Sequence, residues 1–207
     1  MALSSPQSIF ERCLNWTVHD CGLSYFTVGK GRHALCGAHL LRELTALIEQ
    51  GSEWAKAMHG YLLEAYKASR QGPIVAFEQT HWRSRYEQLC EQADDQELPP
   101  LLFFKPNGQT RRANRSKGRN LLERLMLHQD AVLAFAFEPG VPLTNNQAER
   151  DLRPVKVKQR VSGCFRTESG AAIYARIAGF VSTMRKNGRN VFDQLVSVLS
   201  GSFQWAT

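Results

Sequence analysis

The sequence predicts an α+β fold that is predominantly α-helical. Apolar residues recur at intervals of three and four over most of the chain between His39 and Leu199, which is the period of an amphipathic helix. A segment dominated by β-branched and aromatic residues stands near the start, at 16–20. No internal repeat or low-complexity segment is present. The 207 residues are therefore expected to form one domain, or one with a small appendage.

The first elements expected are strands. Residues 16–20 predict a strand that ends in the acid Asp20, and residues 23–28 favour a second strand before the turn formed by Gly29, Lys30 and Gly31. From His39 the apolar spacing becomes helical.

Three helices are predicted next, followed by a break and a fourth helix. They cover 39–51, 54–72 and a stretch that begins with Pro73 in its first turn, since proline suits that position. Residues 94–118 interrupt the pattern with two proline-containing turns and a cluster of basic residues, most of them arginine. A further helix is predicted over about 120–137.

The last third of the chain predicts three more helices. Thr144, Asn145 and Asn146 are capping residues, and a short helix after them is expected to kink or end at Pro154. An amphipathic helix is expected over 173–184. Another follows over 191–199, with Asn190 as its cap and Asp193 in the capping-box position.

Positive charge is concentrated in one part of the sequence. Residues 105–189 hold 17 Lys and Arg against six Asp and Glu, a net charge of +11, whereas residues 1–104 hold nine against 12. Such an imbalance indicates a polyanionic partner, of which nucleic acid is the commonest, although a solvated basic face is the alternative.

Several classes of protein are disfavoured. The chain has no run of 18 apolar residues, so no membrane span is expected, and its first 20 residues do not have the pattern of a signal peptide. The five cysteines are odd in number and scattered. We therefore expect reduced thiols and a cytoplasmic location.

Two long motifs contain the candidate functional residues. The first contains HDCGLSYF at 19–26 and HALCGAHLLREL at 33–44. The second contains TNNQAERDLRP at 144–154, VKVKQR at 155–160 and SGCFR at 162–166, and RKNGRNV follows at 185–191. Together they resemble the large transposase of the insertion-sequence family sixty-six, from Val18 to Leu199. The second motif is long and unusual in composition, so it is the more specific of the two.

The resemblance implies a DDE-type enzyme that cuts and joins DNA with an RNase H-like core. Carried over, the second catalytic Asp is Asp20 and the catalytic Glu is Glu149, both as ligands of Mg²⁺, for which Mn²⁺ would substitute. The implied organisation is a lead-in at 1–17 with a remnant of the core sheet, and the C-terminal part of the catalytic domain at 18–200. Within it, a large helical insertion covers about 40–138, and the Glu helix with the C-terminal helices covers about 144–200.

One catalytic carboxylate of the pattern has no counterpart. No Asp precedes Asp20, and Glu11 is the only acid ahead of it. Gly22 stands where the family usually has an aromatic residue. We therefore expect an incomplete RNase H-like core that binds DNA but is inactive alone. The alternatives are a non-catalytic, regulatory DNA-binding product that acts on an intact transposase, and a residual metal-dependent nuclease.

The expected partners are transposon ends and target DNA, and also an intact transposase or a second copy of this chain. Two basic groups suit phosphate contacts: Arg111, Arg112, Arg115, Lys117 and Arg119 in the loop, and Arg150, Arg153, Lys156, Lys158 and Arg160 beside Glu149.

Other motif residues are Cys36, His39, Arg42, Asn145 and Asn146. Cys36 and His39 have the spacing of zinc ligands, but without a second pair a buried thiol and a packing or capping histidine are favoured.

Overall fold

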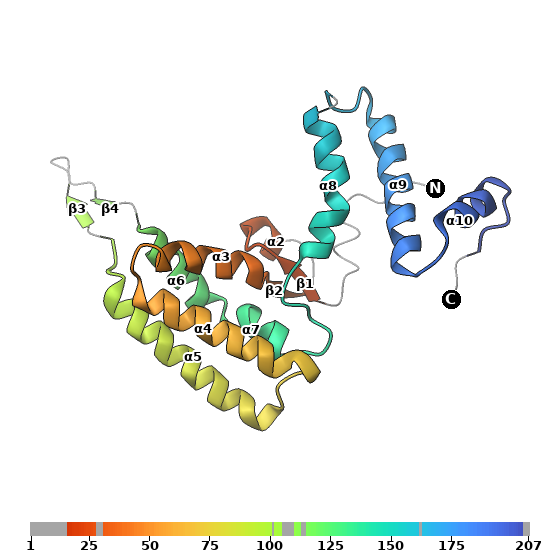
Figure 1. Cartoon of the computed structure of the whole chain (residues 1–207). Helices are drawn as coiled ribbons and strands as arrows, with labels where there is room; N and C mark the ends of the chain where they lie inside the picture. The colour runs from red at the N-terminus through yellow and green to blue at the C-terminus, as the bar shows by residue number, and fades with distance from the viewer. Residues whose placement is uncertain are drawn as a thin grey trace. The chain divides into compact units, whose positions relative to one another are not determined.

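The computed structural model describes residues 16–27, 31–100, 102–104, 110–112, 115–161 and 163–204. The chain divides into two compact units, Met1–Asn145 and Asn146–Thr207, which are described one at a time. The described residues are mainly helical with a few short strands, as predicted (Figure 1). Residues 1–15 of the predicted lead-in at 1–17 and residues 29–30 of the predicted turn lie outside the described residues.

The first unit begins with a small parallel sheet. Strand β1 (Trp16–His19) pairs in parallel with β2 (Arg32–Leu35), with His19 opposite Leu35. The strand predicted at 16–20 is therefore confirmed. The strand predicted at 23–28 is wrong, because Leu23–Thr27 form helix α2. A parallel partner requires a crossover, so the chain must leave the sheet after β1 before β2 returns beside it.

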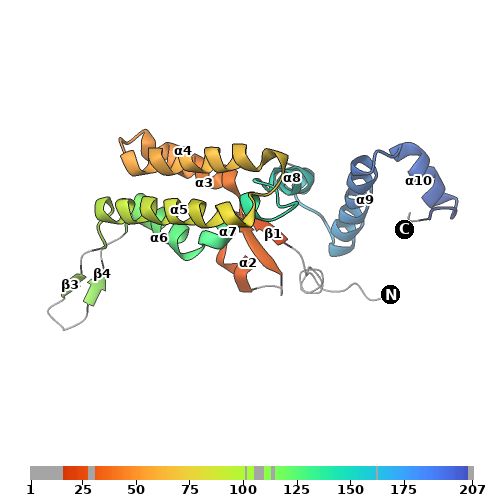
Figure 2. The same ribbon diagram turned by 90° about the horizontal axis from the view of Figure 1, so that it is seen from below.

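Five helices and a short 3₁₀ turn build the rest of this unit. They are α3 (Gly37–Ile48), α4 (Glu53–Ala68), η1 (Ser69–Gln71), α5 (Ala76–Gln96), α6 (Lys117–Leu127) and α7 (Gln129–Phe137). Helix α4 packs against α3 and α5, α5 packs against α6, and α7 packs against β2 (Figure 2). The core is apolar and fully enclosed, with Leu44, Met58, Tyr61, Tyr86, Leu122, Leu125 and Leu133 among its buried side chains. This packed helical layer supports the strand ends.

Two predicted helix boundaries are wrong. Pro73 does not begin α5, because the Ile74 N–H donates to the Ala136 carbonyl of α7 at 2.8 Å and the helix starts only at Ala76. The single helix predicted over 120–137 is two helices, α6 and α7, which are separated at His128 with φ −117°.

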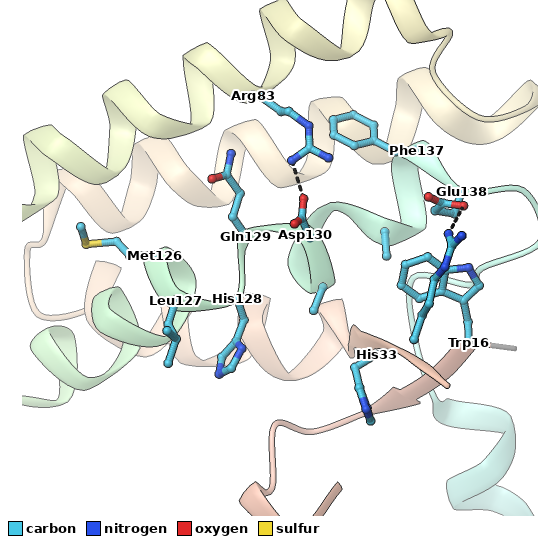
Figure 3. Close-up of a pocket in the computed structure, with 13 residues that line it drawn as sticks. Trp16, His33, Arg83, Met126, Leu127, His128, Gln129, Asp130, Phe137 and Glu138 are labelled. Carbon is cyan, nitrogen blue, oxygen red and sulfur yellow. Dashed lines mark hydrogen bonds and ion pairs between the residues drawn. The ribbon is translucent and has the colours of Figure 1, made fainter. Parts of the chain in front are cut away.

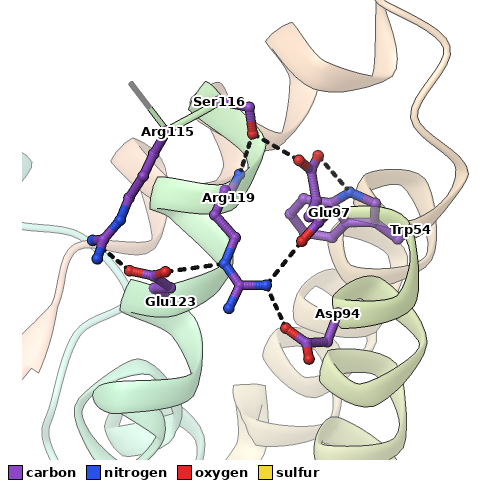
Figure 4. A network of polar contacts seen from close by, with 7 residues as sticks. All are labelled: Trp54, Asp94, Glu97, Arg115, Ser116, Arg119 and Glu123. Carbon is purple, nitrogen blue, oxygen red and sulfur yellow. Dashed lines mark hydrogen bonds and ion pairs between the residues drawn. The ribbon is translucent and has the colours of Figure 1, made fainter. Parts of the chain in front are cut away.

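A polar network closes the corner between α4, α5 and α6 (Figure 4). The Glu97 carboxylate accepts from Trp54 Nε1 at 3.1 Å and from Ser116 Oγ at 2.7 Å. Ser116 Oγ also accepts the Arg119 N–H at 2.8 Å, so the same hydroxyl caps α6. Gly118 packs directly on this carboxylate, since a Cβ there would lie 1.8 Å from Glu97 Oε1. A side chain at position 118 would therefore displace the Glu97 carboxylate from this network.

A hairpin stands between α5 and α6. Strands β3 (Leu102–Phe104) and β4 (Thr110–Arg112) pair in antiparallel fashion, with Phe103 opposite Arg111. Part of the loop predicted at 94–118 is thus a strand pair.

The second unit consists of α8 (Asn146–Val161), α9 (Glu168–Lys186) and α10 (Val191–Leu199). Helix α8 runs through Pro154, so of the two predicted effects of this proline, a kink or the end of the helix, the second is wrong. The predicted cap of α10 is confirmed, because Asn190 Oδ1 accepts from the N–H groups of Phe192 and Asp193. Among the described residues, no helix is long and apolar enough to cross a membrane.

The Glu97 network predicts different effects of alanine at two helix glycines. Gly118→Ala should displace the Glu97 carboxylate and lower the free energy of unfolding by about 1–3 kcal/mol. Gly60 lies in α4 with no neighbouring heavy atom within 4 Å of its Cβ position. Gly60→Ala should therefore leave stability unchanged or raise it by up to about 1 kcal/mol. Urea unfolding of both variants measures this, and a Gly118→Ala variant as stable as the unmodified chain would contradict the role of the network.

Candidate functional site

Asp20 lies at the end of β1 on a short, tightly held turn. The carbonyl of His19 accepts the Cys36 N–H at 2.8 Å, which ties the end of β1 to the end of β2. After Asp20 the backbone turns sharply, because Cys21 has φ 68°, a left-handed conformation that costs a non-glycine residue about 1 kcal/mol. The Asp20 side chain itself is exposed. The Asp20 carboxylate is therefore accessible to solvent and lies at a strand end that hydrogen bonds hold in place.

The ring of His19 lies beneath this turn. Its side chain is only 2% exposed, and among the described residues it is the one polar or charged residue, tyrosines aside, that is buried. Its Nδ1 accepts the Cys21 N–H at 3.1 Å, and its Nε2 lies 3.2 Å from His33 Nδ1. Tyr25 stacks on the ring at 4.8 Å and Phe26 meets it edge-on at 4.8 Å. The motif residues HD and SYF therefore form one packed group.

The environment of His19 keeps its ring neutral at neutral pH. Burial, and after it the nearby His33, lowers its pKa to about 4, and the Asp20 carboxylate opposes that change. Burial also lowers the pKa of His128, which stacks on Phe26 at 4.4 Å.

The two long sequence motifs meet beside this strand end. The Gly37 N–H donates to the Leu143 carbonyl at 2.7 Å, and the Asn145 N–H donates to Cys36 Sγ at 3.4 Å. A Cβ at Gly37 would lie 2.3 Å from Leu143 Cδ1 and 3.1 Å from the Leu143 carbonyl oxygen, so the approach depends on glycine. We call these contacts the 36–145 clasp. Cys36 is a buried thiol, as favoured from the sequence, and it serves the clasp.

Glu149 lies in the first turn of α8, and its side chain is exposed. The five predicted basic residues of this helix are also exposed. Residues three or four apart share a helix face, so four of them form a stripe that we call the α8 stripe: Arg150, Arg153, Lys156 and Arg160. On another face, Asp151 accepts from Ser182 at 2.8 Å and Lys186 at 2.5 Å and thereby joins α8 to α9.

The basic residues of the predicted loop have a different environment. Arg119 is only 15% exposed, and its guanidinium bonds Asp94 at 2.5 Å, Glu123 at 3.0 Å and the Glu97 carbonyl at 2.8 Å (Figure 4). Arg115 pairs with Glu123 at 2.6 Å. Lys117 is exposed in the first turn of α6. The side chains of Arg111 and Arg112 lie outside the described residues, although their backbone belongs to β4.

A pocket of about 580 Å³ lies on the first unit (Figure 3). Two ion pairs border it, Arg83 with Asp130 at 2.5 Å and Arg32 with Glu138 at 3.2 Å. His33 and His128 also line it, whereas Asp20 does not. Sequence reasoning did not single out this pocket, because its residues come from β1, β2, α5, α6 and α7 and have no common motif.

Comparison with protein families decides the family of the chain. The model of the family described as "Transposase IS66 family" matches residues 6–173, which is more than half of the sequence. The chain belongs to the IS66 transposase family. The resemblance inferred from the motifs is therefore confirmed. Comparisons with curated proteins and with solved structures gave no match.

The donor atoms of the family pattern suit a hard divalent cation. Mg²⁺ prefers carboxylate oxygens and retains several waters, and Asp20 and Glu149 are both exposed acids of this type. They belong to different units of this IS66-family chain. Among the described residues, no group of three His, Cys, Asp or Glu side chains is close enough to hold a metal ion. The chemistry of these carboxylates therefore suits Mg²⁺, and two of the three acids that the family resemblance implies are present.

The lowered pKa of His19 predicts a pH-dependent stability. The folded imidazole stays neutral down to about pH 4, whereas the unfolded imidazole takes up a proton below its ordinary pKa of 6.5. The unfolded state then binds more protons, so the free energy of unfolding should fall between pH 6.5 and 4, by up to about 3 kcal/mol. Urea unfolding across this range should show a shallower dependence in His19→Asn, which lacks the titrating ring. Parallel pH profiles for the two proteins would contradict this role of His19.

Proposed function

We propose that this chain contributes catalytic carboxylates and a DNA-binding surface to a DDE-type transposase, which cleaves phosphodiester bonds and transfers strands from an RNase H-like core. One observation carries the proposal. The 36–145 clasp joins the motif that holds Asp20 to the motif that holds Glu149, over more than 100 positions of sequence. Glu149 follows Asn145 by four positions of sequence and lies in the first turn of α8.

The chemistry suits these residues. Asp20 and Glu149 would hold divalent metal ions, and such ions would help to activate the attacking oxygen and to stabilise the leaving oxygen of a phosphodiester. Asp20 offers its carboxylate from a strand end that hydrogen bonds to Cys36 and the His19 ring hold in place. Glu149 offers its carboxylate from a helix. Rigid supports of this kind suit a reaction that depends on accurate positioning.

We assign the main DNA contacts to the α8 stripe. Its side chains are exposed on one helix face and adjoin Glu149 in sequence. The Arg119 guanidinium, in contrast, is mostly enclosed and bonded within the fold. Neutralising phosphates releases counterions, so binding through the stripe should be strongly salt-dependent and insensitive to sequence.

The first test removes charge from the stripe. The variant with Arg153, Lys156 and Arg160 all changed to Gln should bind random duplex DNA more weakly. Its plot of log affinity against log salt should be less steep by up to about 2.7, since each phosphate contact contributes about 0.9. Fluorescence anisotropy at several salt concentrations measures both quantities.

The matched control removes three positive charges from the first unit. Lys56, Lys67 and Arg70 are exposed in α4 and η1, so changing all three to Gln should leave the slope within error of the unmodified chain. Equal losses in the two triple variants would mean that only net charge matters, and the assignment to α8 would fail.

The second test concerns catalysis. The 207 residues contain Asp20 and Glu149 but no earlier Asp, so the polypeptide of these residues alone should not cut element-end DNA with Mg²⁺ or Mn²⁺. A polypeptide with a family N-terminal segment fused ahead of residue 14 should cut. In that polypeptide, Asp20→Asn and Glu149→Gln should each abolish cleavage and leave DNA binding nearly unchanged.

The control for this test is Asp95→Asn, since Asp95 is an exposed acid of α5, and it should retain cleavage. Metal-dependent cutting by the 207-residue polypeptide that disappears in Glu149→Gln would overturn the need for a third carboxylate. Binding without cleavage in the fused polypeptide would favour the regulatory, non-catalytic function instead.

A further inference from the structure

His19 is a buried histidine inside a catalytic motif, and its burial has a structural reason. A polar ring in an apolar site is tolerated when its nitrogens find partners. Both nitrogens of His19 have one, the Cys21 N–H at 3.1 Å and His33 Nδ1 at 3.2 Å. The ring also packs on Tyr25 and Phe26. His19 is therefore held on both ring edges and on its face.

These contacts bracket Asp20. Before it, the His19 carbonyl accepts the Cys36 N–H at 2.8 Å. After it, the His19 ring accepts the N–H of Cys21, whose φ of 68° turns the chain away from the sheet. One residue thus fixes the peptide groups on both sides of Asp20.

The partners also define the tautomer of the neutral ring. A backbone N–H is only a donor, so Nδ1 must be unprotonated where it meets Cys21. The ring proton is then on Nε2, which donates to His33 Nδ1.

We propose that His19 is a positioning residue, whose unprotonated Nδ1 holds the left-handed turn at Cys21 and so fixes the direction of the Asp20 carboxylate. This inference rests on the proposed function, since it gives Asp20 its chemical role. His33 completes the arrangement as the partner of Nε2, which the Cys21 contact leaves as the protonated ring nitrogen.

Two substitutions separate this role from simple packing. His19→Asn keeps an acceptor where Nδ1 stands and loses the link to His33. His19→Gln extends its amide toward the place of Nε2, so it keeps that link and loses the acceptor for Cys21. Both variants lose the ring that packs on Tyr25 and Phe26, so the loss of packing is shared between them.

The first readout is amide hydrogen exchange of Cys21 by NMR in the 207-residue chain. Exchange in His19→Asn should stay close to that of the unmodified chain, whereas in His19→Gln it should be about tenfold faster. Nitrogen shifts of the unmodified His19 ring should show the proton on Nε2. A proton on Nδ1, or equal exchange of Cys21 in the two variants, would overturn the proposal.

The second readout uses Mn²⁺ alone, as a paramagnetic probe. Broadening of the Asp20 and Cys21 amide signals should persist in His19→Asn, weaken in His19→Gln and vanish in Asp20→Asn. If Mn²⁺ leaves these signals sharp in the unmodified chain, the proposed metal-binding role of Asp20 fails. The exchange of Cys21 then still decides whether His19 holds the turn. Equal broadening in the Asn and Gln variants would contradict the positioning role.

Discussion

The hydrogen bond from the Gly37 N–H to the Leu143 carbonyl, at 2.7 Å, is the contact on which the arrangement of the candidate site depends. It brings the chain that leaves α7 back to the ends of the parallel strands, where the Asn145 N–H reaches Cys36 Sγ. Because a Cβ at position 37 would collide with Leu143, the glycine is a steric requirement of this approach. The two motifs thus meet through backbone groups and the Cys36 thiol, and Asp20 and Glu149 are both exposed.

The helices of the first unit pack against the strands that carry this site. Helix α7 packs against β2, and α4 joins α3 and α5 around a core of fully buried Leu, Met and Tyr side chains. Burial of apolar surface contributes most of the stability of such a layer. A small sheet of two strands is marginal by itself, so the parallel pair depends on these helices.

Charge alone did not distinguish the roles of the basic residues. Arg119 and Arg153 are equally basic in sequence, but Arg119 bonds Asp94, Glu123 and a carbonyl, whereas Arg153 is exposed on α8. A cation enclosed by acids has little electrostatic attraction left for phosphate. The net charge of +11 over residues 105–189 therefore overstates the surface available to DNA.

The sequence by itself determined the family, the mainly helical fold, the strand at 16–20 and the α10 cap, because these depend on local patterns and specific motifs. Only the tertiary structure decided that residues 23–27 are helical, that Ile74 pairs with α7 before α5 begins, and that Cys36 meets Asn145. The same holds for the partners of His19, which come from β2 and from the turn after β1. The contacts of Ile74 with Ala136, of Cys36 with Asn145 and of His19 with His33 join segments far apart in sequence, which no window of local sequence contains.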